Sequence, residues 1–221
     1  MYGGNAMGGV INVITKDIQA QPTGSIKVSA GSCNTLGTQV WMSGRTKLLP
    51  KLGWSLNSFY RRGDGYIIAP EETRDSTDVK TNLWEYNVGG KLAYHFNDSS
   101  KLDIGYNYFD DKTGDGTQVY DPEGGYYKYR THHAYTTYHG WVGSTQITAN
   151  AYMQLENYMN QKEQLKTEKT PPFAITQYAL YLTDSHRNDA GLWISATKSA
   201  GTHHKITYGT DIRLSGADAS D

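Results

Sequence analysis

The sequence predicts an all-β protein, and its strand pattern is that of a partial transmembrane antiparallel β-barrel. Period-two alternation of apolar and polar residues recurs in segments of about ten residues from Gly24 to Leu214. Helical periodicity is scarce, and every other connection between the segments is long and polar. This regular exchange of short turns and long loops is typical of outer-membrane barrels.

The clearest predicted strand runs from Leu52 to Arg61, with one apolar and one polar face. The apolar side is expected to carry Leu52, Trp54, Leu56, Ser58 and Tyr60, and the polar side Gly53, Ser55, Asn57, Phe59 and Arg61. Comparable alternation runs through residues 82–96, 101–108, 147–156 and 205–214, and less cleanly through 38–46 and 132–143. We therefore expect about nine meander strands.

The predicted connections fall into two classes. Short turns are expected at residues 48–53, 96–100, 142–145 and 200–204, and long polar links at 61–82, 111–129 and 160–177. Aromatic residues lie near several strand ends, at Tyr60, Trp84, Phe96, Tyr108 and Tyr158. Aromatic girdles at the two membrane interfaces would explain this placement.

Composition excludes several other classes of protein. The chain has 221 residues, of which only 37% are hydrophobic, and a formal net charge of −1. No nucleic-acid partner is expected, because basic and acidic residues are interspersed. Cys33 is the only cysteine, so the chain has no internal disulfide framework. No window approaches the roughly 18 consecutive apolar residues of a membrane-spanning helix.

The opening stretch MYGGNAMGGVINVITKD carries a recognisable motif. It resembles the C-terminal end of the plug domain in TonB-dependent outer-membrane receptors, where glycine turns precede an apolar strand ending in Thr-Lys. The matching positions include Tyr2, Gly3, Gly4, Gly8, Gly9, Asn12, Thr15 and Lys16. Residues 23–45 then resemble the first barrel hairpin of the family, and residues 52–66 its third strand leading into an external loop.

The resemblance implies an architecture and a location. Residues 1–17 would be the end of the plug, and residues 24–221 the N-terminal part of a barrel of about 22 strands. The chain would then be a fragment, because it is too short to close such a barrel. The resemblance also implies the outer membrane of a Gram-negative bacterium, with outer-membrane lipid as a partner.

The resemblance further implies active uptake of a scarce ligand, with no catalytic residues. The expected ligand is large and external, a ferric siderophore first and cobalamin or haem next. Energy would come from the TonB complex, which would act on a segment upstream of this chain.

Ligand contacts are expected in the long external loops, because binding residues concentrate in loops held by a rigid scaffold. The candidates are Arg61, Arg62, Tyr66, Tyr126, Tyr127 and Tyr129. Arginines could bind an anionic iron chelate, and tyrosine rings could stack on a planar or sugar-bearing ligand.

No cofactor is expected, with one open alternative. The loop DDKTGDGTQVYDPEG offers hard oxygen ligands at Asp110, Asp111, Asp115 and Asp121. Its spacing excludes a helix-loop-helix calcium hand, because Pro122 stands at the twelfth position from Asp111. An irregular structural calcium site stays open beside the simpler interpretation of a solvated loop.

Two other functions share parts of these patterns. A passive porin-like channel would have the same strands, although the motif from Tyr2 to Lys16 disfavours it. A soluble β-rich binding module would use its aromatic residues as a recognition face. Solubility without detergent would favour this module.

Overall fold

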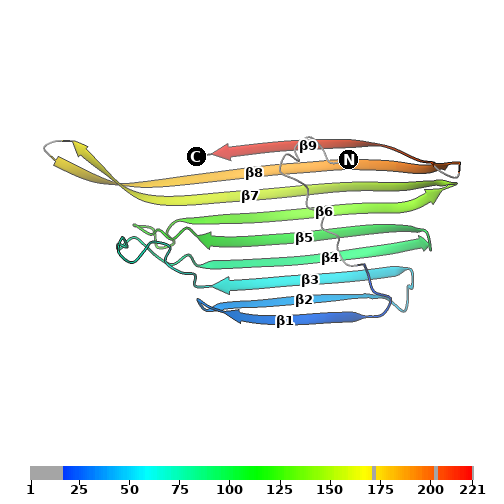
Figure 1. The fold of residues 1–221 in the computed structure, drawn as a ribbon, viewed down its shortest axis with the longest axis horizontal. Coiled ribbons are helices and arrows are strands. Elements are labelled where there is room, and N and C mark those ends of the chain that lie inside the picture. The colour runs from blue at the N-terminus through cyan, green and yellow to red at the C-terminus, as the bar shows by residue number, and fades with distance from the viewer. Residues whose placement is uncertain (1–16, 171–172, 202–203, 221) are drawn as a thin grey trace.

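The computed structural model describes residues 17–170, 173–201 and 204–220, which form one nine-stranded antiparallel sheet (Figure 1). The strands are β1 (Thr23–Gly31), β2 (Thr35–Arg45), β3 (Leu52–Gly63), β4 (Leu83–Asn97), β5 (Ser100–Gly114), β6 (Tyr126–Val142), β7 (Thr145–Thr170), β8 (Phe173–Ala200) and β9 (His204–Ser220). Each strand pairs with its neighbour in the sequence, so the predicted meander of nine strands is confirmed. The motif from Tyr2 to Lys16 lies outside the described residues. In the described ranges, no helix is long and apolar enough to cross a membrane.

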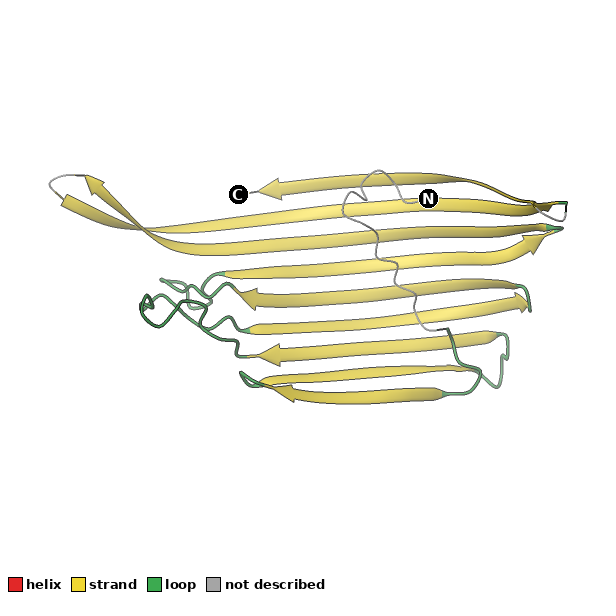
Figure 2. Cartoon of the chain, viewed as in Figure 1, coloured by secondary structure: helices red, strands yellow, loops and turns green. Residues whose placement is uncertain are grey.

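The connections divide the sheet into a short-turn end and a long-loop end (Figure 2). Two of the three predicted long links contain a true loop, at residues 64–82 and 115–125. The link predicted at 160–177 is wrong, because β7 and β8 continue through it and pair in register as far as Thr170 and Phe173. This hairpin projects beyond the other strand ends in Figure 1.

The pairing register confirms two chemically different faces. On the apolar face, Leu56 of β3 lies opposite Gly90, and Leu92 of β4 lies opposite Ile104 of β5. These three large side chains are each more than half exposed, at 55%, 51% and 52%. The polar face carries Asn57, whose Nδ2 donates to Oδ1 of Asn87 on β4 over 2.8 Å.

The sheet is a single layer with almost no buried core. Among the described apolar side chains, only Ala93 and Tyr126 are buried. Its cohesion therefore comes mainly from the backbone ladders and from cross-strand side-chain pairs. An exposed apolar face with this strand pattern suits contact with lipid hydrocarbon.

The apolar face changes character near the long-loop end. Most of its central positions are aliphatic or aromatic, up to Tyr108 on β5 and Leu155 on β7. Toward the loops, the same face continues with Asp110 and Lys112 on β5, beside Arg130 on β6. This step from apolar to charged residues marks the edge of the band that could lie in a membrane.

Candidate functional site

The two long loops join each other at the long-loop end. The amide of Val79 donates to the carbonyl of Gly116 over 2.9 Å, and the amide of Gln118 donates to the carbonyl of Thr77 over 2.8 Å. An isolated bridge between Asp78 and Thr117 lies between these bonds. Loop 64–82 and loop 115–125 therefore form one connected surface, which we call the joined loops.

Glu163 of β7 holds the second loop against the extended hairpin. Its carboxylate accepts hydrogen bonds from the amides of Val119 at 2.7 Å and Asp121 at 2.8 Å, with a longer bond of 3.3 Å from Tyr120. Tyr178 of β8 donates its hydroxyl to the same carboxylate over 2.7 Å. Glu163 is only 2% exposed, so its carboxylate has lost its hydrogen bonds to water. The bonds from the three amides and from Tyr178 replace them and make burial of the charge tolerable.

These contacts change the acidity of both side chains, which lie beyond the apolar band. Burial alone would raise the pKa of Glu163, but the Tyr178 hydroxyl and the three amides lower it below its ordinary value. The hydrogen bond to Glu163 raises the pKa of Tyr178 to about 12. The pair is thus a carboxylate and a neutral phenol over a wide pH range.

The four candidate calcium ligands are divided between strand and loop. Asp110 and Asp111 are consecutive residues of β5 and so point to opposite faces, whereas Asp115 and Asp121 lie in the loop. Asp110 pairs with Arg130 at 3.2 Å, and Asp115 accepts the amide of Thr117 at 2.8 Å. Within the described ranges, no group of three or more His, Cys, Asp or Glu side chains is arranged for a metal. A calcium site in this loop stays a prediction.

The six predicted ligand-contact residues are placed less uniformly than expected. Tyr126, Tyr127 and Tyr129 lie at the start of β6, so their assignment to the loop is wrong. Arg61 and Arg62 lie in β3, just before its last residue, Gly63. Of these residues, Arg61, Tyr127 and Tyr129 lie on the polar face, whereas Arg62 and Tyr126 lie on the apolar face. The alternation of side chains along a strand separates neighbours in this way.

The polar-face candidates have partners on adjacent strands. Arg61 forms an ion pair of 2.6 Å with Glu85 of β4. The ring of Tyr129 lies 4.7 Å from that of Tyr158 on β7, measured between centroids. Tyr66 lies in loop 64–82, is 64% exposed, and has its carbonyl bonded to the amide of Thr81 at 3.0 Å.

The polar face also carries a tyrosine row that sequence patterns did not single out. Tyr135 of β6 and Tyr152 of β7 are register partners, and each also pairs with a glycine on its other side, Gly105 of β5 and Gly191 of β8. Each ring covers the space above its glycine partner. Only the pairing of four separate strands reveals this row.

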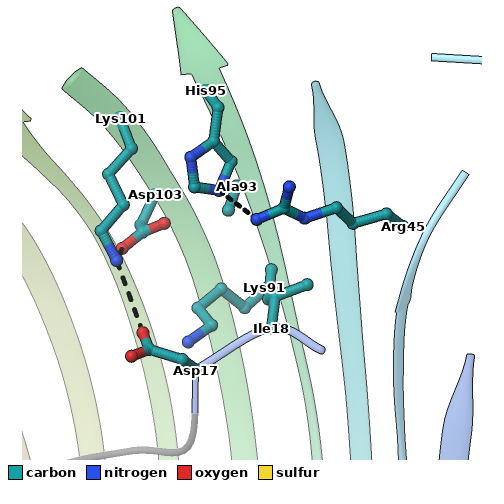
Figure 3. Close-up of a pocket in the computed structure, with 8 residues that line it drawn as sticks. All are labelled: Asp17, Ile18, Arg45, Lys91, Ala93, His95, Lys101 and Asp103. Atoms are coloured by element: carbon teal, nitrogen blue, oxygen red, sulfur yellow. Dashed lines mark hydrogen bonds and ion pairs between the residues drawn. The ribbon is translucent and has the colours of Figure 1, made fainter. Parts of the chain in front are cut away.

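The segment before β1 crosses the polar face at the short-turn end (Figure 3). The amide of Gln19 donates to the hydroxyl of Ser43 on β2 over 3.2 Å, and Asp17 lies 3.5 Å from the ammonium of Lys101 on β5. Ile18 lies above Gly53 of β3, where a larger residue would meet it. Asp17 and Ile18 line a hollow of about 300 Å³ together with Arg45 and His95. In it, Nη2 of Arg45 lies 3.5 Å from Nε2 of His95.

Comparison with known proteins finds one similar sequence and several similar folds. No family model matches the chain. The rhizobactin receptor of Rhizobium meliloti (strain 1021) is 27% identical over 124 residues, which cover 51% of this chain and 16% of that receptor. The ferripyoverdine receptor of the outer membrane of Pseudomonas aeruginosa, bound to ferripyoverdine, matches 92% of this chain with a TM-score of 0.69 and 13% identity. The chain thus resembles TonB-dependent outer-membrane receptors over its barrel strands.

The match covers only a part of these receptors. The chain spans 29% of the ferripyoverdine receptor and 29% of P. aeruginosa FpvA bound to a heterologous pyoverdine, which has a TM-score of 0.69 and 12% identity. The nine meander strands correspond to part of a TonB-dependent receptor barrel. The ferripyoverdine receptor is a protein of the outer membrane of Pseudomonas aeruginosa.

Proposed function

We propose that this chain forms part of the barrel of a TonB-dependent receptor that imports a ferric siderophore. The names of the relatives support this ligand class, because one is a rhizobactin receptor and another was solved with ferripyoverdine bound. Cobalamin and haem are the next candidates. The apolar face would contact outer-membrane lipid, and the polar face would line the interior.

We assign residues 1–17 to the end of a plug and residues 24–221 to the barrel. The support is the path of Asp17, Ile18 and Gln19, which lie on the polar face before the chain turns into β1. A plug inside the barrel requires a link that leaves the interior on this side. The TonB complex would act on the plug through a segment upstream of these residues.

Ligand contact is proposed for the joined loops and the adjoining polar face. Arg61 offers a planar guanidinium that suits carboxylate or catecholate oxygens of an anionic chelate. Tyr127 and Tyr129 offer ring faces on the same side of β6, and Tyr66 projects from loop 64–82. A hollow of about 640 Å³ continues down the polar face beside Lys27, Trp41 and Tyr135. Together these groups would give an external ligand a path into the interior.

The test is uptake by cells that carry the complete receptor gene. A deletion strain and its complemented parent are given ⁵⁵Fe-labelled hydroxamate, catecholate and mixed-type siderophores, and in parallel labelled haem and cobalamin. We expect uptake of one siderophore class only in the complemented strain, abolished by a protonophore. Uptake of haem or cobalamin alone would replace the siderophore assignment. Protonophore-insensitive diffusion of small solutes would instead indicate a porin.

A further inference from the structure

The hollow of about 640 Å³ on the polar face lies between two aromatic side chains. Trp41 of β2 lines it toward β1, and Tyr135 of β6 lines it on the opposite side. Between them, the side chains of Asn57 and Asn107 converge over Gly89 of β4, which has no side chain to fill the space. The hollow is therefore a wide seat across β1 to β6, with ring surfaces at both sides.

Several polar groups of this lining are available to a ligand. Four of them form no ion pair or side-chain hydrogen bond with any other residue in the described part of the chain, and these are Lys27, Gln39, Asn107 and Tyr135. The ammonium, the two amides and the hydroxyl can all donate hydrogen bonds. Pockets that bind small molecules combine apolar walls with a few polar groups of this kind. The free donors suit a ligand that carries many oxygen atoms.

The hollow is positively charged. Lys27 and Lys91 contribute to its lining, and no Asp or Glu is among the described residues that line it. Asp103, on the same face of β5, already pairs with Lys101 at 3.4 Å. The electrostatic complement of the hollow is therefore an anion.

The aromatic walls narrow the class of anion. A planar aryl ring packs favourably on the faces of Trp41 and Tyr135. Oxygen anions on that ring would then accept charge-assisted hydrogen bonds from lysine and further bonds from the amides. A catecholate has both the ring and the anionic oxygens, whereas a hydroxamate has the oxygens without the ring.

The position of the hollow separates it from the ligand contacts proposed at the long-loop end. Asn57 is four residues from Arg61 along β3, which corresponds to about 13 Å. Lys91 also lines the hollow of about 300 Å³ at the short-turn end. The larger hollow is thus an intermediate position between the two ends of the polar face.

We propose that the 640 Å³ hollow is a second ligand site, which receives a catecholate group of the imported chelate during its passage through the interior. Trp41 and Tyr135 would hold the ring, and Lys27 its anionic oxygens. The proposal rests on the import function proposed above and adds the chemical class of the ligand. Such a site raises the occupancy of the ligand midway along its path, so its loss should slow transport without weakening the first binding step.

The test uses the complete receptor and a ferric tris-catecholate siderophore labelled with ⁵⁵Fe. Lys27→Gln and Trp41→Leu should each slow the initial uptake rate in cells about fivefold, as for loss of one charge-assisted or aromatic contact. The dissociation constant of the purified receptor, measured by fluorescence quenching, should stay close to the wild-type value. The heat-modifiable mobility of each variant on gels reports whether its barrel has folded. Lys27 is exposed, so Lys27→Gln keeps the proposal testable if Trp41→Leu fails to fold.

Lys205→Gln and Trp193→Leu are the matched controls. They make the same chemical changes on the polar face of β9 and β8, and neither residue lines the hollow. Both controls should take up the ferric catecholate like the wild type. An equal fall in the controls, or uptake by Lys27→Gln at or above the wild-type rate, would overturn the proposal.

Two other outcomes separate this inference from the import function. If a ferric trihydroxamate is the only siderophore that the receptor imports, the catecholate site is overturned and siderophore import stands. If the receptor imports haem or cobalamin alone, both proposals are overturned. A loss of affinity in purified Lys27→Gln that matches its loss of uptake would place Lys27 in the first binding step and would also overturn the second site.

Discussion

The hydroxyl of Tyr178 donates a hydrogen bond of 2.7 Å to the carboxylate of Glu163, and that carboxylate also holds the backbone of loop 115–125. Glu163 lies 44 positions from Val119 in the sequence, yet they are 2.7 Å apart between Oε2 and the amide nitrogen. Loop 115–125 also bonds to loop 64–82, so the contacts of Glu163 with the first loop help to support both loops. A surface that contacts ligand benefits from such support, because less conformational freedom is lost on binding.

Replacing Glu163 by Gln should loosen loop 115–125. The amide group keeps one acceptor oxygen but turns an NH₂ donor toward the backbone amides or toward Tyr178. Losing the charge-assisted bonds should lower the free energy of local opening of the loop by about 2 kcal/mol. This corresponds to about 30-fold faster hydrogen exchange at the amides of Val119 and Asp121. Exchange mass spectrometry of the complete receptor measures this. Glu156→Gln, on the same strand but the other face, is the control, and similar exchange in both variants would contradict the role of Glu163.

The support from Glu163 should also depend on pH. Its pKa in the folded protein is below the ordinary value of 4.5. The stabilisation is therefore complete above about pH 4.5 and is lost as the pH falls through the pKa of the folded protein. The pKa of Tyr178 is raised from 10.0 to about 12. The contribution of its hydroxyl to stability is therefore complete below pH 10 and is lost as the pH rises through about 12. Loop exchange, corrected for the intrinsic rate, should therefore be flat from pH 5 to 9 and rise at more acidic pH. In Glu163→Gln the acidic rise should disappear.

The glycines opposite the tyrosine row should resist enlargement. In Gly105→Ala the new methyl group would meet the ring of Tyr135, which must leave its place on the polar face. Such overpacking typically costs about 1–3 kcal/mol. Gly216→Ala on β9 is the control, because a methyl group there meets nothing within 4 Å. Thermal unfolding of the purified complete receptor should shift downward only in Gly105→Ala, and equal midpoints would show that the ring is free to move.

Ligand affinity should depend on Arg61 more than on Glu85. Arg61→Gln removes the guanidinium, whereas Glu85→Gln leaves it in place and only weakens the 2.6 Å ion pair that orients it. We expect a loss in siderophore affinity of about tenfold or more for Arg61→Gln and a smaller one for Glu85→Gln, as for loss of a charge-assisted contact. Fluorescence quenching on ligand addition gives both dissociation constants. The reverse order would remove Arg61 from the contact surface.

Side-chain alternation was sufficient to predict a meander of about nine strands and the two faces of the clearest ones, because successive side chains along a strand point to opposite faces. It did not delimit β8, which the sequence analysis left unassigned. This approach failed for the run NQKEQLKTEK, because Leu165 is its only apolar residue and the run therefore shows no alternation, although β7 continues through it. The Glu163 contacts could not be predicted either. They join residues from β7, β8 and a loop, and only the pairing register brings these segments together.

The assignment of the two faces can itself be tested by adding charge to each. Trp54 and Ile104 lie on the apolar face, whereas Asn57 lies on the polar face beside the 640 Å³ hollow. Trp54→Arg and Ile104→Arg would place a guanidinium in hydrocarbon, at a cost of about 2–4 kcal/mol near the bilayer midplane. Asn57→Arg has water and polar neighbours available and loses mainly its 2.8 Å bond to Asn87. The folded fraction of the complete receptor, read from its heat-modifiable mobility on gels, should fall in the first two variants and stay close to wild type in the third. Equal folded fractions in all three would mean that the apolar face does not contact lipid.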